Sequence, residues 1–171
     1  MRTDAAINSG NSGGGLYDTS GRLIGITNAK NVAEQTDNIC YALPIDQVKG
    51  LVDNLLANGG VVRRAMLGVM TQVTGSKATL NQNGKLIITE EVTVKEVSSG
   101  VAATGKLQVG DIIKAVTVNG KTTQITRMYM VGEALFAVRK GDTVTMTVVR
   151  GGQQTDVQIT YDKDAYFTIY N

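Results

Sequence analysis

The sequence of 171 residues contains no histidine, and it has a single cysteine, Cys40, and a single proline, Pro44. One cysteine cannot form a disulfide within the chain, and without histidine the usual zinc-binding patterns cannot be assembled. The same absence bears on catalysis, because serine, threonine and cysteine nucleophiles commonly rely on an imidazole base. We therefore expect neither a structural zinc site nor a complete nucleophile–imidazole pair, and no metal or organic cofactor is implied.

Strong charge of one sign and long hydrophobic runs are also lacking. Seventeen Lys and Arg residues stand against fifteen Asp and Glu residues, a formal net charge of +2. A nucleic-acid partner usually requires a basic stripe, and a membrane-spanning helix needs about 18 or more consecutive apolar residues. We therefore expect no nucleic-acid partner and no membrane span. The start turns polar at Asn8, so we expect no signal peptide and interpret the chain as cut from a longer protein.

Glycine is abundant, at 20 residues, and short alternating segments follow one another along the chain. This composition is typical of a protein rich in β-structure and turns. Strands are predicted at 22–27, 38–43, 67–71, 86–89, 92–97, 111–118, 143–150 and 156–161, and residues 166–170 could form another. Helices are predicted at about 46–58, with Asp46 as N-cap, and at 99–104 and 126–139, and a hairpin turn is predicted at Gly151-Gly152.

The strongest local motif is Gly10-Asn11-Ser12-Gly13-Gly14-Gly15. Flanking glycines permit a tight turn that exposes the Ser12 hydroxyl, and successive backbone N–H groups in such a turn could bind a developing oxyanion. A loop of glycine, serine and asparagine is by itself more often only a turn. From these residues alone, a nucleophile and a simple turn both remain open.

The wider stretch Thr3–Gly14, followed by Gly21–Ile26 and Tyr41–Pro44, closely resembles the end of the protease domain of the HtrA/Deg family of trypsin-like serine proteases. The resemblance implies part of a chymotrypsin-like β-barrel, with Ser12 as catalytic nucleophile and the N–H groups of Gly10 and Ser12 as oxyanion hole. It also implies substrate-binding residues: Asn28, Ala29 and Lys30 along the substrate backbone, and Ala6, Ile7 and Ala29 around a small apolar specificity pocket.

Two positions depart from the family pattern, because Ser9 and Gly15 stand where proline is common. The larger departure is that the family's catalytic histidine and aspartate lie upstream of the segment matched here. Asp4 corresponds to a loop residue near the active site and not to the catalytic aspartate. Since an isolated serine hydroxyl is a weak nucleophile, we expect this chain alone to be inactive.

A second set of motifs follows the predicted helix. Arg64–Val69, Leu107–Ile113 and Val118–Lys121 occur in the order found in the PDZ domain of HtrA/Deg proteases, and this resemblance implies a domain that binds peptide C-termini by strand addition. Its peptide-binding residues are Met66, Leu67 and Gly68 as N–H donors for the carboxylate, Val69–Thr71 as the pairing edge, and Val69, Met128 and Val131 around the last peptide side chain.

Neighbouring residues have simpler interpretations. Leu135 could also reach the pocket, but we expect Leu135 and Val138 to belong to the core, because they continue the apolar stripe of the helix. Arg63 and Arg64 could attract a carboxylate, but we expect solvated linker charges. The acidic pair Glu90-Glu91 belongs to no recognisable constellation and is assigned to the surface.

The overall interpretation is an α+β protein, mainly β, with residues 1–62 as the end of a trypsin-like protease domain and residues 63–171 as a PDZ domain. The resemblance implies a bacterial serine endopeptidase of protein quality control, in the cell envelope or secreted, that acts on misfolded or exposed polypeptides. Because residues 1–45 leave strand edges unpaired, we expect a homo-oligomer formed through residues 1–58, and the alternative is that this segment packs against the PDZ domain of the same chain. Two alternatives stay open: a naturally short, non-catalytic peptide-binding or scaffolding module, and an unrelated β-protein.

Overall fold

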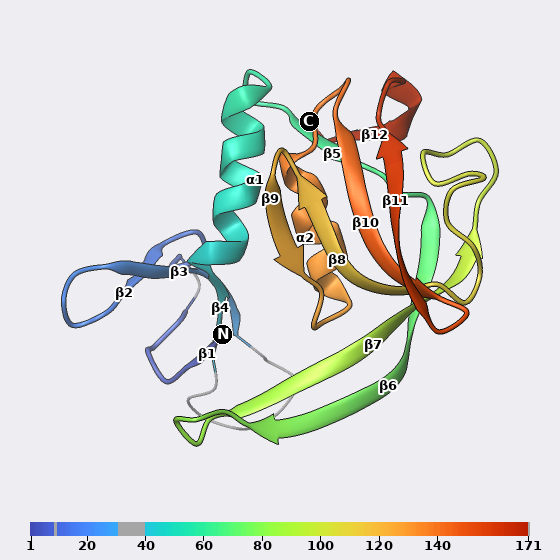
Figure 1. Ribbon diagram of the computed structural model, residues 1–171. Helices are drawn as coiled ribbons and strands as arrows, with labels where there is room; N and C mark the ends of the chain where they lie inside the picture. Colours follow the sequence, from blue (N-terminus) through green and yellow to red (C-terminus); the bar gives the residue numbers. More distant parts are fainter. Residues whose placement is uncertain (9, 31–39, 171) are drawn as a thin grey trace. The chain divides into compact units, whose positions relative to one another are not determined.

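The computed structural model describes residues 1–8, 10–30 and 40–170. The chain falls into two compact units, Met1–Asp53 and Asn54–Asn171. This division lies inside a helix, whereas the sequence placed the domain boundary after residue 62, and that boundary stays a prediction. Strands dominate and the helices are few and mostly short (Figure 1), so the predicted α+β class is confirmed.

The first unit contains an antiparallel sheet with the strand order β1-β4-β3-β2. Its strands are β1 (Arg2–Thr3), β2 (Gly15–Tyr17), β3 (Leu23–Lys30) and β4 (Cys40–Pro44). Along β4 the side chains of Cys40 and Ala42 are buried while those of Tyr41 and Leu43 are exposed, so the strand covers its core with one face only. The predicted strands at 22–27 and 38–43 correspond to β3 and β4, and residues 38 and 39 lie outside the described residues.

Helix α1 (Ile45–Ala57) follows the single proline directly. Proline has a fixed φ and no N–H to donate, so it commonly stands at the very start of a helix. Because the helix already begins at Ile45, Asp46 lies in its first turn and is not the predicted N-cap. In that position its carboxylate still faces the positive end of the helix dipole. The predicted bounds of about 46–58 differ from the observed ones by one residue at each end.

The second unit is built on an antiparallel sheet with the order β11-β10-β8-β7-β6, in which β9 also pairs with β8. Its strands are β6 (Val69–Leu80), β7 (Leu86–Val97), β8 (Ile112–Val118), β9 (Lys121–Gln124), β10 (Thr143–Arg150) and β11 (Gln153–Thr160). Arg150 pairs with Gln153, which confirms the predicted hairpin turn between them. A separate pair joins β5 (Val62–Ala65) to β12 (Phe167–Tyr170), so residues 166–170 do contribute a strand.

Two short helices close one face of this sheet. Helix α2 (Tyr129–Ala134) continues into a 3₁₀ helix, η1 (Leu135–Ala137), so the predicted helix at 126–139 exists but is shorter. The buried core includes Val131, Leu135 and Val138 from this segment, together with side chains of β7, β8, β10 and β11. Leu135 and Val138 are therefore buried as expected.

The predicted helix at 99–104 is wrong. These residues form turns, in which the Thr104 hydroxyl accepts a hydrogen bond from the Val101 N–H at 2.9 Å and donates one to the Ser98 carbonyl at 3.1 Å. Threonine and serine side chains compete in this way with the backbone bonds of a helix. A second short 3₁₀ helix, η2 (Asp164–Tyr166), lies just before β12.

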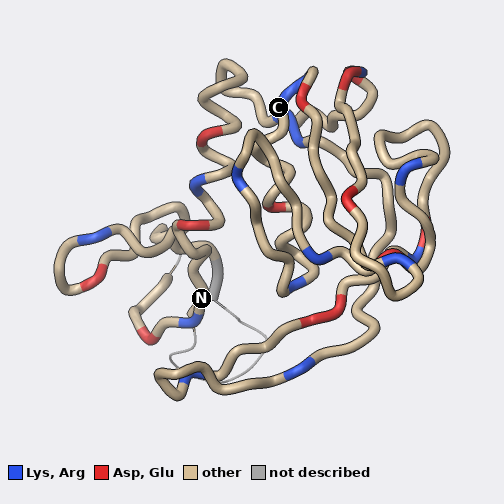
Figure 2. Tube along the Cα trace, in the orientation of Figure 1, with Lys and Arg blue, Asp and Glu red and all other residues tan. Residues whose placement is uncertain are grey.

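Charged residues are distributed along the trace with both signs interspersed (Figure 2). Within the described residues, no helix has the length and apolar character needed to cross a membrane.

Candidate functional sites

A tight turn presents Ser12. The Asn11 N–H donates to the Asn8 carbonyl at 3.0 Å, the Gly14 N–H to the Asn11 carbonyl at 2.9 Å, and the Gly13 N–H to the Thr27 carbonyl at 2.8 Å. The last bond ties the turn to β3. Gly10 has a φ of 102°, a region that favours glycine because a side chain would be strained there. The glycines of the motif therefore serve this turn geometry.

The Ser12 side chain is exposed, and its hydroxyl donates to the Asn28 carbonyl at 3.0 Å. Among the described residues, the backbone N–H groups of Gly10 and Ser12 donate to no protein acceptor. An accessible hydroxyl beside unused amide donors suits a nucleophile with an oxyanion hole. A carbonyl oxygen is not a base, so the hydroxyl is not activated by its present partner.

The other predicted substrate residues are only partly brought together. Asn28 contacts Ser12 through its carbonyl, and Ala6 is exposed, but Ile7 is buried and its carbonyl lies 4.0 Å from the Cys40 sulfur. The backbones of Ala29 and Lys30 belong to β3, while their side chains lie outside the described part of the structure. The apolar specificity pocket stays a prediction.

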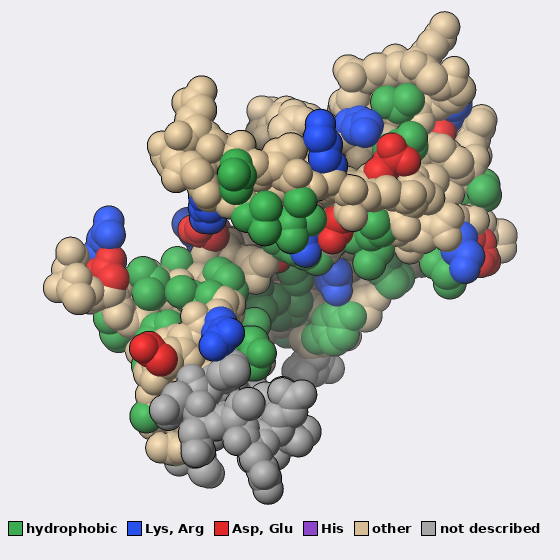
Figure 3. All heavy atoms as spheres, turned by 90° about the horizontal axis from the view of Figure 1, so that it is seen from below, with side chains coloured by type: hydrophobic (Ala, Val, Ile, Leu, Met, Phe, Trp, Pro, Cys, Tyr) green, Lys and Arg blue, Asp and Glu red, His purple; other side chains and the backbone are tan. Residues whose placement is uncertain are grey.

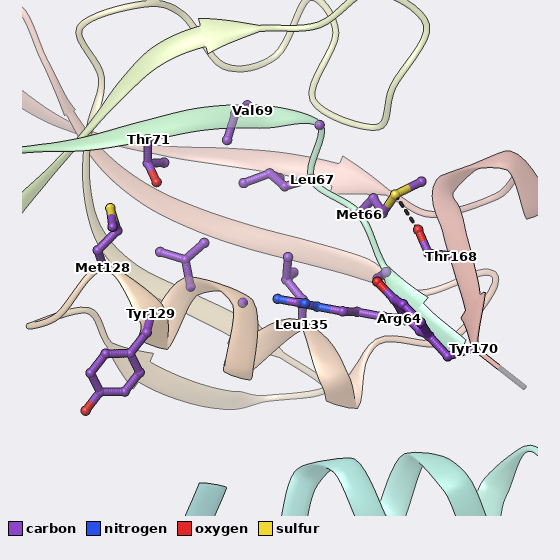
Figure 4. Close-up of a pocket in the computed structure, with 14 residues that line it drawn as sticks. Arg64, Met66, Leu67, Val69, Thr71, Met128, Tyr129, Leu135, Thr168 and Tyr170 are labelled. Atoms are coloured by element: carbon purple, nitrogen blue, oxygen red, sulfur yellow. Dashed lines mark hydrogen bonds between the residues drawn. The ribbon is translucent and has the colours of Figure 1, made fainter. Parts of the chain in front are cut away.

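The second unit contains a pocket of about 460 Å³ between β6, α2 and the residues that precede β6 (Figure 4). All of the predicted peptide-binding residues line it: Met66, Leu67, Gly68, Val69, Thr71, Met128 and Val131. Sequence reasoning missed or set aside other lining residues: Arg64, Ala65, Tyr129, Gly132, Leu135, Thr168 and Tyr170. The last two come from β12, and no local pattern could have shown that β12 returns to this pocket.

The loop before β6 offers two of the three expected amide donors. The N–H of Met66 donates to the Tyr166 carbonyl at 2.8 Å and is therefore not available, which corrects the prediction for that residue. The N–H groups of Leu67 and Gly68 have no acceptor within the described residues. The carbonyls of Leu67 and Gly68 are held by the N–H groups of Ala103 at 3.3 Å and Ser98 at 3.0 Å, so the loop is fixed from behind.

Arg64 is the single charged residue among the described residues that line the pocket. Its guanidinium lies over the Phe136 ring, 5.2 Å from the centroid, and a Cβ placed on Gly132 would come within 2.4 Å of its Nη2 atom. The side chain therefore extends across the pocket between β5 and α2 (Figure 4). The expectation of a solvated linker charge is wrong for Arg64, because stacking and close packing hold it in place.

Glu90 on β7 fixes the start of α2. Its carboxylate accepts hydrogen bonds from the Met128 N–H at 2.8 Å and from Arg127 Nε at 2.9 Å. The bond from the Met128 N–H, opposed by desolvation and aided by Arg127, holds the pKa of Glu90 below its usual value. Glu90 therefore positions Met128 at the edge of the pocket and is more than the surface charge that the sequence suggested.

Within residues 1–8, 10–30 and 40–170, no three acidic, cysteine or histidine side chains gather closely enough to hold a metal ion.

Comparison with known proteins gives consistent similarities. Protease Do-like 1, a chloroplastic protein of Arabidopsis thaliana, is 34% identical over 169 residues, which cover 95% of this chain and 37% of that protein. A probable periplasmic serine endoprotease of Brucella suis, described as DegP-like, is 30% identical over 166 residues, or 94% of this chain and 30% of that protein. No family model matches the chain.

A solved structure of the HtrA-type protease AlgW with a tripeptide has a TM-score of 0.59 and 28% identity, and the match covers 99% of this chain and 53% of that one. The chain thus spans well under half of the two curated relatives and about half of the solved protein.

Proposed function

The chain belongs to the HtrA family of serine proteases over the part of those proteins that it matches, and on that premise we propose that the whole protein is a serine endopeptidase that cleaves misfolded or exposed polypeptides. The similarity to proteins named as endoproteases supports the proposal. The observation in this chain that carries it is the exposed Ser12 hydroxyl beside the unused amide donors of Gly10 and Ser12.

In the proposed acyl transfer, Ser12 Oγ attacks the scissile carbonyl and the N–H groups of Gly10 and Ser12 stabilise the charge on its oxygen. The end of β3, with Asn28, Ala29 and Lys30, would lie along the substrate backbone. The reaction also needs a base that takes the Ser12 proton. Because this sequence contains no histidine, we expect the 171-residue chain by itself to be inactive.

Activity measurements on the chain and on the whole protein separate these statements. The chain and its Ser12→Ala variant should cleave unfolded casein equally poorly and should both resist a fluorophosphonate probe. In the whole protein, Ser12→Ala should abolish cleavage and labelling. Ser12-dependent labelling of the chain alone would contradict the predicted inactivity, and an active whole-protein Ser12→Ala variant would contradict the assignment of the nucleophile.

We further propose that the pocket of the second unit binds the C-terminus of a peptide, which adds as a strand to the edge of β6. The Leu67 and Gly68 N–H groups would hold the carboxylate, and Arg64 would attract it. Met128, Val131 and Leu135 would surround an apolar last side chain. The lining of the pocket supports this assignment, and AlgW, a similar protease, has been solved with a tripeptide.

Titration calorimetry with matched peptides tests the pocket. A peptide with an apolar last residue and a free carboxylate should bind, and the same peptide with an amidated end should bind more weakly, because charge-assisted hydrogen bonds are the stronger ones. Val131→Ser should weaken binding of the acid peptide, whereas Val109→Ser, at an exposed position outside the pocket lining, should not. Equal affinity for acid and amide would contradict recognition of a carboxylate.

A non-catalytic peptide-binding or scaffolding module is the second candidate function. The pocket of the second unit supports it, because that unit could bind a peptide without any chemistry in the first. Whole-protein cleavage that depends on Ser12 would exclude this candidate, and peptide binding without any cleavage would favour it.

The similarity to known proteins also supports a proposal for the location of the whole protein. The relatives include proteins named as periplasmic and chloroplastic, and we place the whole protein outside the cytoplasm.

In the first unit, β1 and β2 lie at the edges of the sheet and Leu23, Tyr41 and Leu43 are exposed, so we propose self-association through residues 1–58. Light scattering should show a concentration-dependent mass for the full chain, and a strictly monomeric chain at high micromolar concentration would exclude it.

A further inference from the structure

Strands β6 and β7 continue well past the body of the second unit as a two-stranded ribbon (Figure 1). The ribbon comprises residues 75–80 of β6 and 86–91 of β7, and every residue from 72 to 89 is exposed. Among the described residues β6 pairs with β7 alone, so its other edge carries unpaired backbone groups over the whole strand. Such an edge is a ready template for another extended chain.

One face of the ribbon is apolar at its far end. Ala78 pairs with Ile88 and Leu80 pairs with Leu86, and Leu80 and Leu86 are 70% and 57% exposed. Since side chains alternate along a strand, Ile88 and Leu86 share the face of the buried Val92. Figure 3 views the molecule from below, the side on which the ribbon lies in Figure 1, and shows hydrophobic side chains on that surface.

A bulge aligns this face with the pocket. Val73 pairs with Val92 and Gly75 with Glu91, so Thr74 is an additional residue in β6. Because of this additional residue, the even-numbered Ala78 and Leu80 lie on the same face as the odd-numbered Thr71, which lines the pocket. Without the bulge, that face would instead carry Lys77 and Thr79.

The bulge is held in place from the opposite face. The Thr74 hydroxyl lies 2.7 Å from the Thr93 hydroxyl and donates to Glu91 Oε1 at 2.8 Å. Both partners belong to the odd-numbered face of β7, so these bonds lie away from the face that carries Ala78 and Leu80, on which the polar pair Ser76 and Glu90 stands nearer the pocket. The face that carries Thr71 at the pocket therefore continues along the free edge of β6 to Leu80.

We propose that a polypeptide bound in the pocket continues along β6 and becomes the third strand of the ribbon. The site would then recognise apolar residues of the peptide roughly eight to eleven positions before its terminal carboxylate. The proposal rests on the proposed peptide-binding function and extends it to long extended segments. A third strand would satisfy the free edge of β6 and would cover part of the apolar face. A two-stranded ribbon alone is marginally stable in water, which favours such an added strand.

The test compares peptides of two lengths on the full chain. One peptide has about four residues, and the other has about twelve, with the same last four residues, leucine at two positions near the upstream end and threonine elsewhere. A third peptide replaces both leucines by serine. Calorimetry should show that the long leucine peptide binds about tenfold more tightly than the other two, the change expected from burying one or two leucine side chains.

Ribbon variants locate the effect. Leu80→Ser combined with Leu86→Ser should bring the affinity for the long leucine peptide close to that for the short one, and should leave the short one unchanged. Ile87→Ser is the matched control, because Ile87 pairs with Thr79 on the opposite face. All three positions are exposed, and thermal melts that stay unchanged would verify that the variants fold.

Three outcomes would overturn the proposal. In the first, the long and short peptides bind with equal affinity. In the second, the control variant lowers the affinity for the long peptide as much as the ribbon variant does. In the third, the ribbon variant abolishes self-association in light scattering, which would mean that a second copy of the chain occupies the ribbon. If the short acid peptide itself fails to bind, the proposed peptide-binding function has failed as well, so the two failures are distinguishable.

Discussion

The side-chain amide of Asn54, in the last turn of α1, donates a hydrogen bond of 2.8 Å to the backbone carbonyl of Phe136 in η1. The same Nδ2 atom donates to the Arg63 carbonyl at 2.8 Å, and Asn54 Oδ1 accepts from the Arg63 N–H at 2.9 Å. Asn54 is completely buried. One side chain thus connects the end of α1, the start of β5 and the segment that follows α2, all within the second unit.

Replacing Asn54 by Ala should destabilise the second unit by about 2–4 kcal/mol, because buried backbone groups at Arg63 and Phe136 would lose their partner. Urea denaturation of the full chain measures the change. Leu56→Ala, in the same helix but strongly exposed, is the control and should change the free energy of unfolding by less than about 0.5 kcal/mol. An Asn54→Ala variant as stable as this control would show that water can replace these bonds.

Asn54 also illustrates what the sequence could and could not predict. The helix that contains it was predictable because apolar residues recur at helical spacing, and the hairpin at Gly151-Gly152 because turn residues separate two alternating runs. Burial of an asparagine on that helix was not predictable, since its partners lie 9 and 82 residues away. The pairing of β5 with β12 has the same character, because it joins segments about a hundred residues apart.

The residues of the candidate sites also fall into those that the sequence could predict and those that it could not. Ser12 and the pocket residues stood out because their motifs are local and carry their own geometry. The occupied Met66 N–H and the position of Glu90 depend on distant partners, Tyr166 and Met128, and a single sequence contains no signal for either. The bulge at Thr74 was equally hidden, because it becomes visible only when the register of β6 against β7 is known.

Acid should weaken the second unit through Asp111. This buried carboxylate accepts two bonds of 2.7 Å from Arg150 and one of 2.9 Å from the Gln108 N–H. Burial raises the pKa of Asp111, but the bonds from Arg150 and Gln108 lower it more, and the net pKa lies below the usual carboxyl value. A lowered pKa in the folded state means that this stabilisation is complete above about pH 4 and is lost as the pH falls through the lowered value.

The variant Asp111→Asn should therefore cost about 2–4 kcal/mol at pH 7, since it breaks the ion pair between a buried carboxylate and the partly exposed Arg150. Its free energy of unfolding should also depend less on pH than that of the unaltered chain below about pH 4. Urea denaturation at a series of pH values tests both statements. Parallel pH profiles for the two proteins would show that other carboxylates dominate the acid response.

Tyr161 should tolerate the loss of its hydroxyl. The residue is completely buried, its hydroxyl has no hydrogen-bond partner in the described part of the chain, and burial raises its pKa. Its ring packs against Tyr166 and Phe167, with centroids 6.3 and 5.9 Å away. Tyr161→Phe keeps this packing and removes an unsatisfied polar group, so the free energy of unfolding should stay the same or rise by up to about 1 kcal/mol.

Two comparisons make that expectation specific. Tyr161→Leu should lower the free energy of unfolding by about 2–4 kcal/mol, because it removes the aromatic contacts and leaves a cavity. A loss of more than about 1 kcal/mol in Tyr161→Phe would instead mean that the hydroxyl makes a bond, for example to a buried water.

Gly68 should be intolerant of any side chain, and for two separable reasons. A Cβ at Gly68 would lie 2.3 Å from the Cβ and Cγ2 atoms of Val101, and the backbone has a φ of 74°. Gly68→Ala should therefore cost about 1 kcal/mol for the backbone conformation and a further 1–3 kcal/mol for the steric conflict. Gly120→Ala isolates the backbone cost, because Gly120 has a φ of 77° and nothing within 4 Å of its added Cβ.

A double-mutant cycle with Val101→Ala then separates the two costs. Removing the Val101 methyl groups leaves its Cβ in place, so part of the conflict should be relieved and Gly68→Ala should cost at least about 1 kcal/mol less in that background than in the unaltered chain. The residual cost should not fall below that of Gly120→Ala. Additive effects of Gly68→Ala and Val101→Ala would show that the loop moves away from Val101, and in that case the amide donors of Leu67 and Gly68 would be displaced and peptide affinity should fall as well.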